Sequence, residues 1–170
     1  REQILENDYN LTGSRYKPSV AIGDKRYVAI SEVCRLTKGA FSSTKTPPGP
    51  YRLVLTAAES GTADEYQFDE PAVCVPLISS LGHGKAALHR IHYAEGRFAL
   101  ANLLVALQPK NLEALDTAFL YHALNARRDA IAGLMKGAAN VGMKPDDLAQ
   151  FQIPLPPLEV QREIVAEIEG

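Results

Sequence analysis

Apolar residues recur along the chain with the period of strands at first and with the period of helices later. Runs of β-branched, aromatic and aliphatic residues bounded by turn residues predict strands at 27–30, 33–37, 51–56, 72–78, 86–93 and 98–107. The last of these is interrupted near Asn102. Residues 38–50 are so rich in Gly, Pro, Ser and Thr that they predict a loop, and residues 79–84 predict a glycine-rich turn.

The helical period appears at 115–135, where Asp116 is a suitable N-cap and a break is expected within 125–129. Gly137 ends this stretch, and a one-turn helix at 145–150 leads to a short strand that ends at Ile153. Strands and helices in this order predict an α/β (α+β) fold, in which helices flank a mixed, twisted β-sheet.

Prolines at positions 154, 156 and 157 turn the chain after this strand, and an amphipathic helix begins at Pro157. Its apolar side chains fall on one stripe, formed by Leu158, Val160, Ile164, Val165 and Ile168. Charged residues lie off the stripe. An open apolar stripe on a helix implies a partner that covers it.

Composition places the chain among ordinary globular domains, with 170 residues, 46% hydrophobic residues and a net charge of −2. The charge is unevenly distributed: residues 10–58 carry eight basic and two acidic residues, and residues 59–70 carry five acidic residues and no basic one. A near-neutral total therefore allows a basic face that contacts phosphates. Cys34 and Cys74 sit among apolar neighbours and predict buried, reduced thiols. With no secretion signal and no membrane-spanning run, we expect a cytoplasmic protein and no membrane partner.

The run Ile-Pro-Leu-Pro-Pro-Leu-Glu-x-Gln-x-x-Ile at 153–164 resembles the segment that closes each target recognition domain in type I restriction-modification specificity subunits. Softer motifs extend the resemblance over residues 27–168, among them Lys38-Gly39 and Asn102 before an apolar run. The chain departs from the family in its glycine turn, where Gly82-His83-Gly84-Lys85 replaces an Arg-Gly pair found in many members.

Near the start, the run Asn-Asp-Tyr-Asn-Leu-x-x-Ser-Arg-Tyr at 7–16 resembles the C-terminal end of the methylase region in type I-like adenine-N6 DNA methyltransferases. The two resemblances imply three parts: a linker or methylase end at 1–26, a DNA target recognition domain at 27–156, and the start of a coiled-coil spacer helix at 157–170. They also imply a second spacer helix in cis or in trans, a methyltransferase domain or subunit, and possibly a restriction subunit as partners.

Motifs for catalysis are missing from the sequence. An adenine-N6 methyltransferase needs an Asn/Asp-Pro-Pro-aromatic segment for the flipped base, and the Pro-Pro pairs here follow Thr46 and Leu155. The turn at 82–86 lacks the first glycine and the Ser or Thr of a P-loop. His89 and His92 would point to opposite faces of a strand, which does not suit a shared metal. We therefore expect a non-catalytic segment with no cofactor or metal of its own, and S-adenosylmethionine in the parent methyltransferase.

Base edges are read by Arg or Lys at guanine, by Asn or Gln at adenine, and by adaptable Ser and Thr. Three predicted loops offer such side chains to double-stranded DNA: Lys38, Ser42, Ser43, Thr44, Lys45, Thr46, Ser80, His83, Lys85, Lys136, Asn140 and Lys144. The sequence thus predicts recognition of one half of a bipartite DNA target for an adenine methyltransferase. The alternative is a structural docking module of the methyltransferase complex that does not read DNA.

Overall fold

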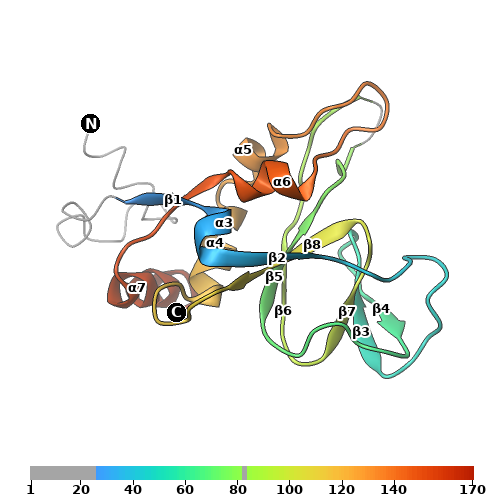
Figure 1. Cartoon of the computed structure of the whole chain (residues 1–170), viewed down its shortest axis with the longest axis horizontal. Coiled ribbons are helices and arrows are strands. Elements are labelled where there is room, and N and C mark those ends of the chain that lie inside the picture. Colours follow the sequence, from blue (N-terminus) through green and yellow to red (C-terminus); the bar gives the residue numbers. More distant parts are fainter. Residues whose placement is uncertain (1–25, 82–83) are drawn as a thin grey trace.

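A computed structural model describes residues 26–81 and 84–170, and the methylase-like run at 7–16 lies outside this described part. Nine strands divide among three sheets in this part of the chain. The order is β1 (Tyr27–Ala29), α3 (Ile30–Val33), β2 (Cys34–Lys38), β3 (Tyr51–Val54), β4 (Gly61–Ala63), β5 (Ala72–Pro76), β6 (His92–Ala94), β7 (Phe98–Leu100), β8 (Leu104–Pro109), α4 (Thr117–Asn125), α5 (Arg128–Ala132), α6 (Pro145–Ala149), β9 (Gln152–Pro154) and α7 (Leu158–Glu169). The helices lie on one side of the central sheet, and β3, β4 and β7 lie on the other (Figure 1).

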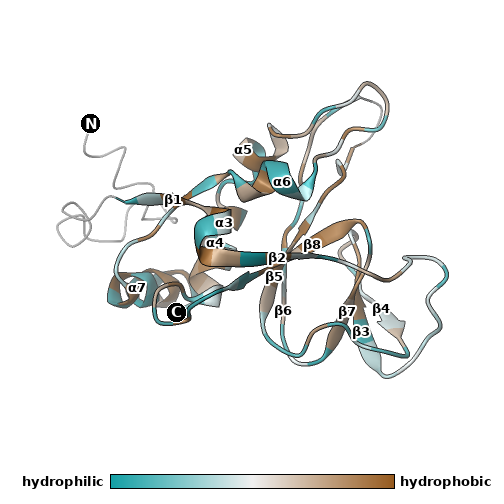
Figure 2. Cartoon of the chain, viewed as in Figure 1, coloured by the Kyte–Doolittle hydropathy of each residue, from teal (hydrophilic) through white to brown (hydrophobic). Residues whose placement is uncertain are grey.

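The central sheet has the order β2-β8-β5-β6 and is antiparallel throughout. Every residue of β5 and β8 is buried, because both faces of the sheet are covered. Alternate side chains serve different cores: Val73 and Val75 join the large core under the helices, whereas Cys74 packs with Phe98 in a smaller core against β3, β4 and β7. Figure 2 shows that β8 in the centre of the sheet is hydrophobic (brown), whereas α7 at the edge of the domain has large hydrophilic stretches (teal).

The third sheet, β4-β3-β7, pairs β3 with β7 in parallel and β3 with β4 in antiparallel. The α+β class and the flanking helices agree with the prediction. The strands form three sheets and not one, because β1 pairs with β9 and β3 pairs with β4 and β7, apart from the central sheet. The break expected near Asn102 separates β7 from β8. The predicted N-cap is confirmed, since the Asp116 carboxylate accepts from the N–H of Phe119 at 3.0 Å.

Several expectations were wrong in detail. The helical stretch ends at Ala132 with Gly133 as its C-cap and not at Gly137, and Ile30 and Val33, expected in strands, belong to the short helix α3. The strand predicted at 86–93 is regular only at His92–Ala94, because Ser79 and Ser80 hydroxyls take the N–H groups of Ala87 and His89 that a strand would pair. Strand β4, Gly61–Ala63, was not predicted, since its three residues carry no alternating pattern of their own.

The apolar stripe of α7 is partly covered within the domain itself. Val160 and Ile164 are buried in the large core, and α7 packs on α4. Val165 and Ile168 pack against the same core but stay partly exposed, and Leu158 is half-buried. The covered part of the stripe needs no external partner, so pairing with a second helix remains a prediction for the half-buried positions.

Candidate nucleic-acid interface

A cleft of ≈ 570 Å³ opens where the central sheet meets the segment before α6. It collects side chains from four places in the chain: Lys38 at the end of β2, Asn102 in the turn between β7 and β8, Ile78 after β5, and Lys136, Asn140 and Lys144 before α6. The fold thus brings together four of the predicted DNA-binding residues, Lys136, Asn140 and Lys144 and, 98 positions before Lys136 in the sequence, Lys38.

An arm borders this cleft and projects from the body of the domain (Figure 1). We use this name for residues 77–81 and 84–87 together with residues 136–143. Lys136 and Gly142 exchange backbone hydrogen bonds of 2.8 and 3.0 Å, which closes a hairpin. The hairpin is fixed to the other segment because Met143 N–H donates to the Leu77 carbonyl and Ser79 N–H donates to the Val141 carbonyl, each at 2.8 Å. The two segments therefore act as one unit.

Gly142 and Gly39 hold segments of this architecture close together. A Cβ on Gly142 would lie 2.6 Å from the Leu77 carbonyl oxygen, so a side chain there would push the hairpin off residues 77–79. A Cβ on Gly39 would lie 1.9 Å from the Ala101 carbonyl oxygen, which would separate the start of the 39–50 loop from the β7–β8 turn. Close backbone approach explains both residues.

Charges and free amides make the cleft a candidate for an anionic ligand. Among the described residues that line it, the one carboxylate is that of Asp147, which accepts from the N–H of Lys144 at 3.0 Å at the start of α6. Within the described residues, none of the three lysines forms an ion pair. Asn102 and Asn140 are exposed, so their amides are available to a ligand.

Asn102 was absent from the residues predicted to bind DNA. Its signal in the sequence was the interruption of an apolar run by a single amide. Its backbone N–H donates to the Phe41 carbonyl at 2.8 Å, which ties the β7–β8 turn to the 39–50 loop and fixes the side chain at the cleft.

The hydroxyls of the 39–50 loop shape the loop itself. Ser42 accepts from the N–H groups of Thr44 and Lys45 at 3.2 and 3.0 Å, and the Thr46 hydroxyl donates to the Ser42 carbonyl. Ser43 and Lys45 are exposed and make none of these side-chain bonds. None of the five residues at 42–46 is among the residues that line the cleft.

In the glycine-rich turn after β5, a serine hydroxyl also bonds to a nearby backbone group. Ser80 accepts from the N–H of His89 at 2.9 Å, so this hydroxyl holds the arm. Lys85 is exposed, whereas His83 lies outside the described residues. In these two segments, Lys45 and Lys85 form no ion pair within the described residues, and the hydroxyls of Ser42 and Ser80 bond to nearby backbone N–H groups.

Burial shifts the pKa of two thiols and one histidine in the direction that favours their neutral forms. Burial raises the pKa of the Cys34 and Cys74 thiols to about 12, and burial together with Arg52 and Arg90 lowers the pKa of His92. No cluster of three or more His, Cys, Asp or Glu in residues 26–81 and 84–170 could hold a metal ion. None of the helices in that part of the chain is long and apolar enough to cross a membrane.

Comparisons with known proteins agree with this architecture. The chain is similar to the S subunit of a type I restriction-modification system from M. genitalium, with 19% identity and a TM-score of 0.69 over 85% of this chain and 38% of that one. It is also similar to the HsdS subunit from Thermoanaerobacter tengcongensis, with 21% identity and a TM-score of 0.61 over 99% and 41% of the two chains.

A further chain, from a structure of type I R-M complex assembly and conformational transition, gives 18% identity and a TM-score of 0.65 over 99% and 44% of the two chains. The chain thus spans about two fifths of the length of these solved relatives. A comparison with curated protein sequences finds no similar protein. The family model of the type I restriction modification DNA specificity domain matches residues 23–169. The chain therefore belongs to the type I restriction modification DNA specificity domain family.

Proposed function

We propose that this specificity domain recognises one half of a bipartite DNA target through the cleft beside the arm. The observation that carries the proposal is the convergence on one concave surface of two exposed asparagine amides and three lysines that form no ion pair with residues 26–81 or 84–170. Lysine ammonium groups neutralise phosphates, and an asparagine amide can bond to N6 and N7 of adenine at once.

Some residues of this surface would position the domain on the DNA backbone, and others would recognise bases. Lys38, Lys136 and Lys144 would hold the phosphates that flank a groove, and Asn102 and Asn140 would reach base edges. Gly137, next to the pair that closes the hairpin, has a positive φ of 135°, and a Cβ there would lie 2.2 Å from the Asn140 carbonyl oxygen, so glycine lets the hairpin that carries Asn140 close tightly. Lys45 in the 39–50 loop and Lys85 on the arm are exposed and would extend the phosphate contacts.

The chemistry of the complex would lie in other parts of the assembly. We propose that S-adenosylmethionine and methyl transfer to adenine belong to a methyltransferase domain or subunit, and that a restriction subunit can join the same complex. Helix α7 would begin the spacer and pair with a second helix in cis or in trans through Leu158, Val165 and Ile168, which keep exposed apolar surface. Membership of the specificity family supports this division.

Charge reversal tests the assignment of the cleft. Lys38→Glu and Lys144→Glu should each weaken binding of the parent protein to duplex DNA by about the same factor on cognate and unrelated sequences, because a phosphate contact carries no sequence information. Arg162→Glu is the matched control, since Arg162 is exposed on α7 and does not line the cleft. If the two cleft variants bind as tightly as the control, the cleft does not contact DNA, and the docking role becomes the better account.

A further inference from the structure

Gln161 lies near the start of α7 and has no exposed surface. Its amide oxygen accepts from the N–H of Asp116 at 2.8 Å, and its amide nitrogen donates to the carbonyls of Ala114 and Pro156, each also at 2.8 Å. Two carbonyls on one side and one N–H on the other leave a single consistent orientation of the amide. One side chain thus joins the start of α4, the loop before it and the proline turn before α7.

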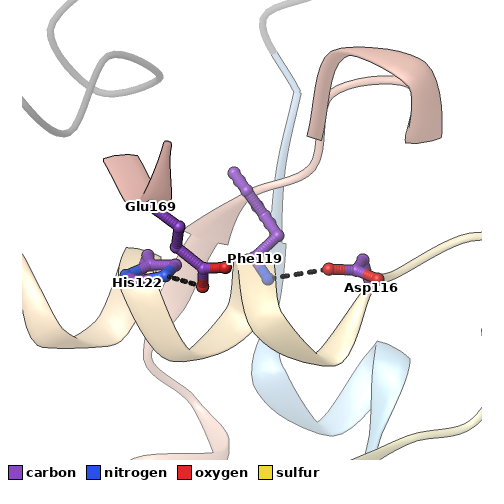
Figure 3. A network of polar contacts seen from close by, with 4 residues as sticks. All are labelled: Asp116, Phe119, His122 and Glu169. Atoms are coloured by element: carbon purple, nitrogen blue, oxygen red, sulfur yellow. Dashed lines mark hydrogen bonds and ion pairs between the residues drawn. The ribbon is translucent and has the colours of Figure 1, made fainter. Parts of the chain in front are cut away.

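The bond to Asp116 completes the start of α4. The Asp116 carboxylate accepts from the N–H of Phe119, the third residue of the helix (Figure 3). In a capping box, that third residue is Glu or Gln and returns a bond to the N–H of the N-cap residue. Phe119 cannot do so, and Gln161 supplies the missing bond from α7. A side chain of α7 therefore completes the N-terminal cap of α4, and this shared contact couples the orientations of the two helices.

A second contact joins the same two helices further along. His122 Nε2 of α4 lies 2.7 Å from Glu169 Oε2 of α7, as Figure 3 shows. Glu169 lies eight positions after Gln161, about 12 Å along the helix, so the two contacts together restrain the direction of α7. The Glu169 side chain is 55% exposed, and such pairs hold weakly. Val160 and Ile164 hold the helix in the core by packing, which does not require a fixed hydrogen-bond geometry. Gln161 is buried and makes three hydrogen bonds, so it is the strongest polar restraint on the direction of α7 within the described residues.

We propose that Gln161 is a positioning residue that fixes the direction in which α7 leaves the domain and thereby sets the spacing at which the domain engages its half of the DNA target. The first part stands on the contacts above, and the second rests on the proposed function. A helix of about 30 residues spans about 45 Å, so a tilt of about 5° at its base moves its far end by about 4 Å. This displacement is roughly one base-pair step.

A distance measurement in the chain tests the first part. Spin labels at Thr37→Cys on β2 and Glu167→Cys on α7 occupy exposed positions, and the native Cys34 and Cys74 are at most 1% exposed, so they stay unlabelled. Gln161→Met keeps a long unbranched side chain and removes the three bonds. Gln152→Met, at an exposed site on β9, is the matched control. Glu167 lies about 9 Å along the helix from Gln161, so the label-to-label distribution should broaden or shift by about 1 Å or more in Gln161→Met only; a distribution identical to the control overturns the proposal.

Methylation by the parent complex tests the second part. Plasmids carry the two half-sites at the native separation and at separations one to three base pairs longer or shorter. Gln161→Met should methylate the shifted sites at least about tenfold more, relative to the native site, than Gln152→Met does, while the bases of the half-site stay the same. Unchanged spacing preference rejects the link to spacing. A change in the half-site bases would instead count against the proposed function, which the distance measurement does not involve.

Gln161→Asn guards against a variant that does not fold. It keeps an amide at a shorter reach and places no charge beside the Ala114 and Pro156 carbonyls, so it can retain part of the three bonds. It should give a distance distribution between those of the parent and Gln161→Met. If both variants unfold the chain, Gln161 is a stabilising residue only, and the positioning role is rejected.

Discussion

Replacing Lys38, Lys136 and Lys144 together by alanine should flatten the salt dependence of duplex binding. The three ammonium groups line one cleft and form no ion pair within the described residues, so each is free to neutralise a phosphate. Each phosphate neutralised on B-DNA contributes about 0.9 to the slope of log affinity against log salt, so three contacts contribute about 2.7. Between about 50 and about 200 mM salt, this slope corresponds to roughly a 40-fold loss of affinity that the triple variant should no longer show.

Fluorescence anisotropy of a labelled duplex, titrated with the parent protein over a series of salt concentrations, measures the slope directly. Arg162→Ala is the control, because it removes a cation from an exposed position of α7 outside the cleft. The triple variant should fold as the parent does, since all three lysines are exposed. A slope that stays within about 0.5 of the control means that these lysines do not contact phosphates, and the reasoning from the cleft to DNA then fails.

Three further predictions follow from single residues. Asn140→Ala should lose about 1–3 kcal/mol of discrimination at one adenine, seen as a single degenerate position in the methylated motif; an unchanged motif counts against base readout by this amide. Gly142→Ala should destabilise the domain by about 1–3 kcal/mol in thermal unfolding, because its Cβ meets the Leu77 carbonyl oxygen. Gly96→Ala, which has φ +73° and no atom within 4 Å of a Cβ, should cost about 1 kcal/mol, and a larger cost than Gly142→Ala would refute the packing argument. Cys74, whose pKa burial raises to about 12, should resist alkylation near pH 8 in the folded chain. The same shift should lower stability as pH rises above the unfolded value of 9.0, because the unfolded thiol ionises first; a flat profile there contradicts it.

Local signals in the sequence carried much of the fold. The N-cap at Asp116 and the turn from Ile153 through the prolines to α7 depend on a few neighbouring residues, so they could be predicted without tertiary information. The residues at 86–91 could not, because the hydroxyls of Ser79 and Ser80, eight and nine positions earlier, accept the N–H groups of Ala87 and His89. Tertiary context overrode β-propensity there.

In the candidate site, too, local sequence predicts the general character of the surface, and tertiary contacts decide the roles of single residues. Lysines and asparagines in glycine-rich loops mark a recognition surface from composition alone. The roles of single residues depend on partners that sequence spacing does not reveal: the Ser42 hydroxyl is used inside its own loop, and Asn102 enters the cleft through a turn between strands. Gln161 falls inside the apolar stripe of α7, between Ile168 and Val165 around the helix, and it is fully buried. Sequence spacing does not reveal the three backbone groups that its amide meets.

The most direct test of the account is a map of methylated adenines in DNA from cells that express the parent protein, with residues 27–150 either native or exchanged for those of a related specificity domain. The account predicts that one half of the methylated motif changes with the exchanged segment, while the other half and the spacing between them stay as they were. A motif that remains unchanged while methylation persists would contradict the recognition role and would leave this domain as a structural part of its complex.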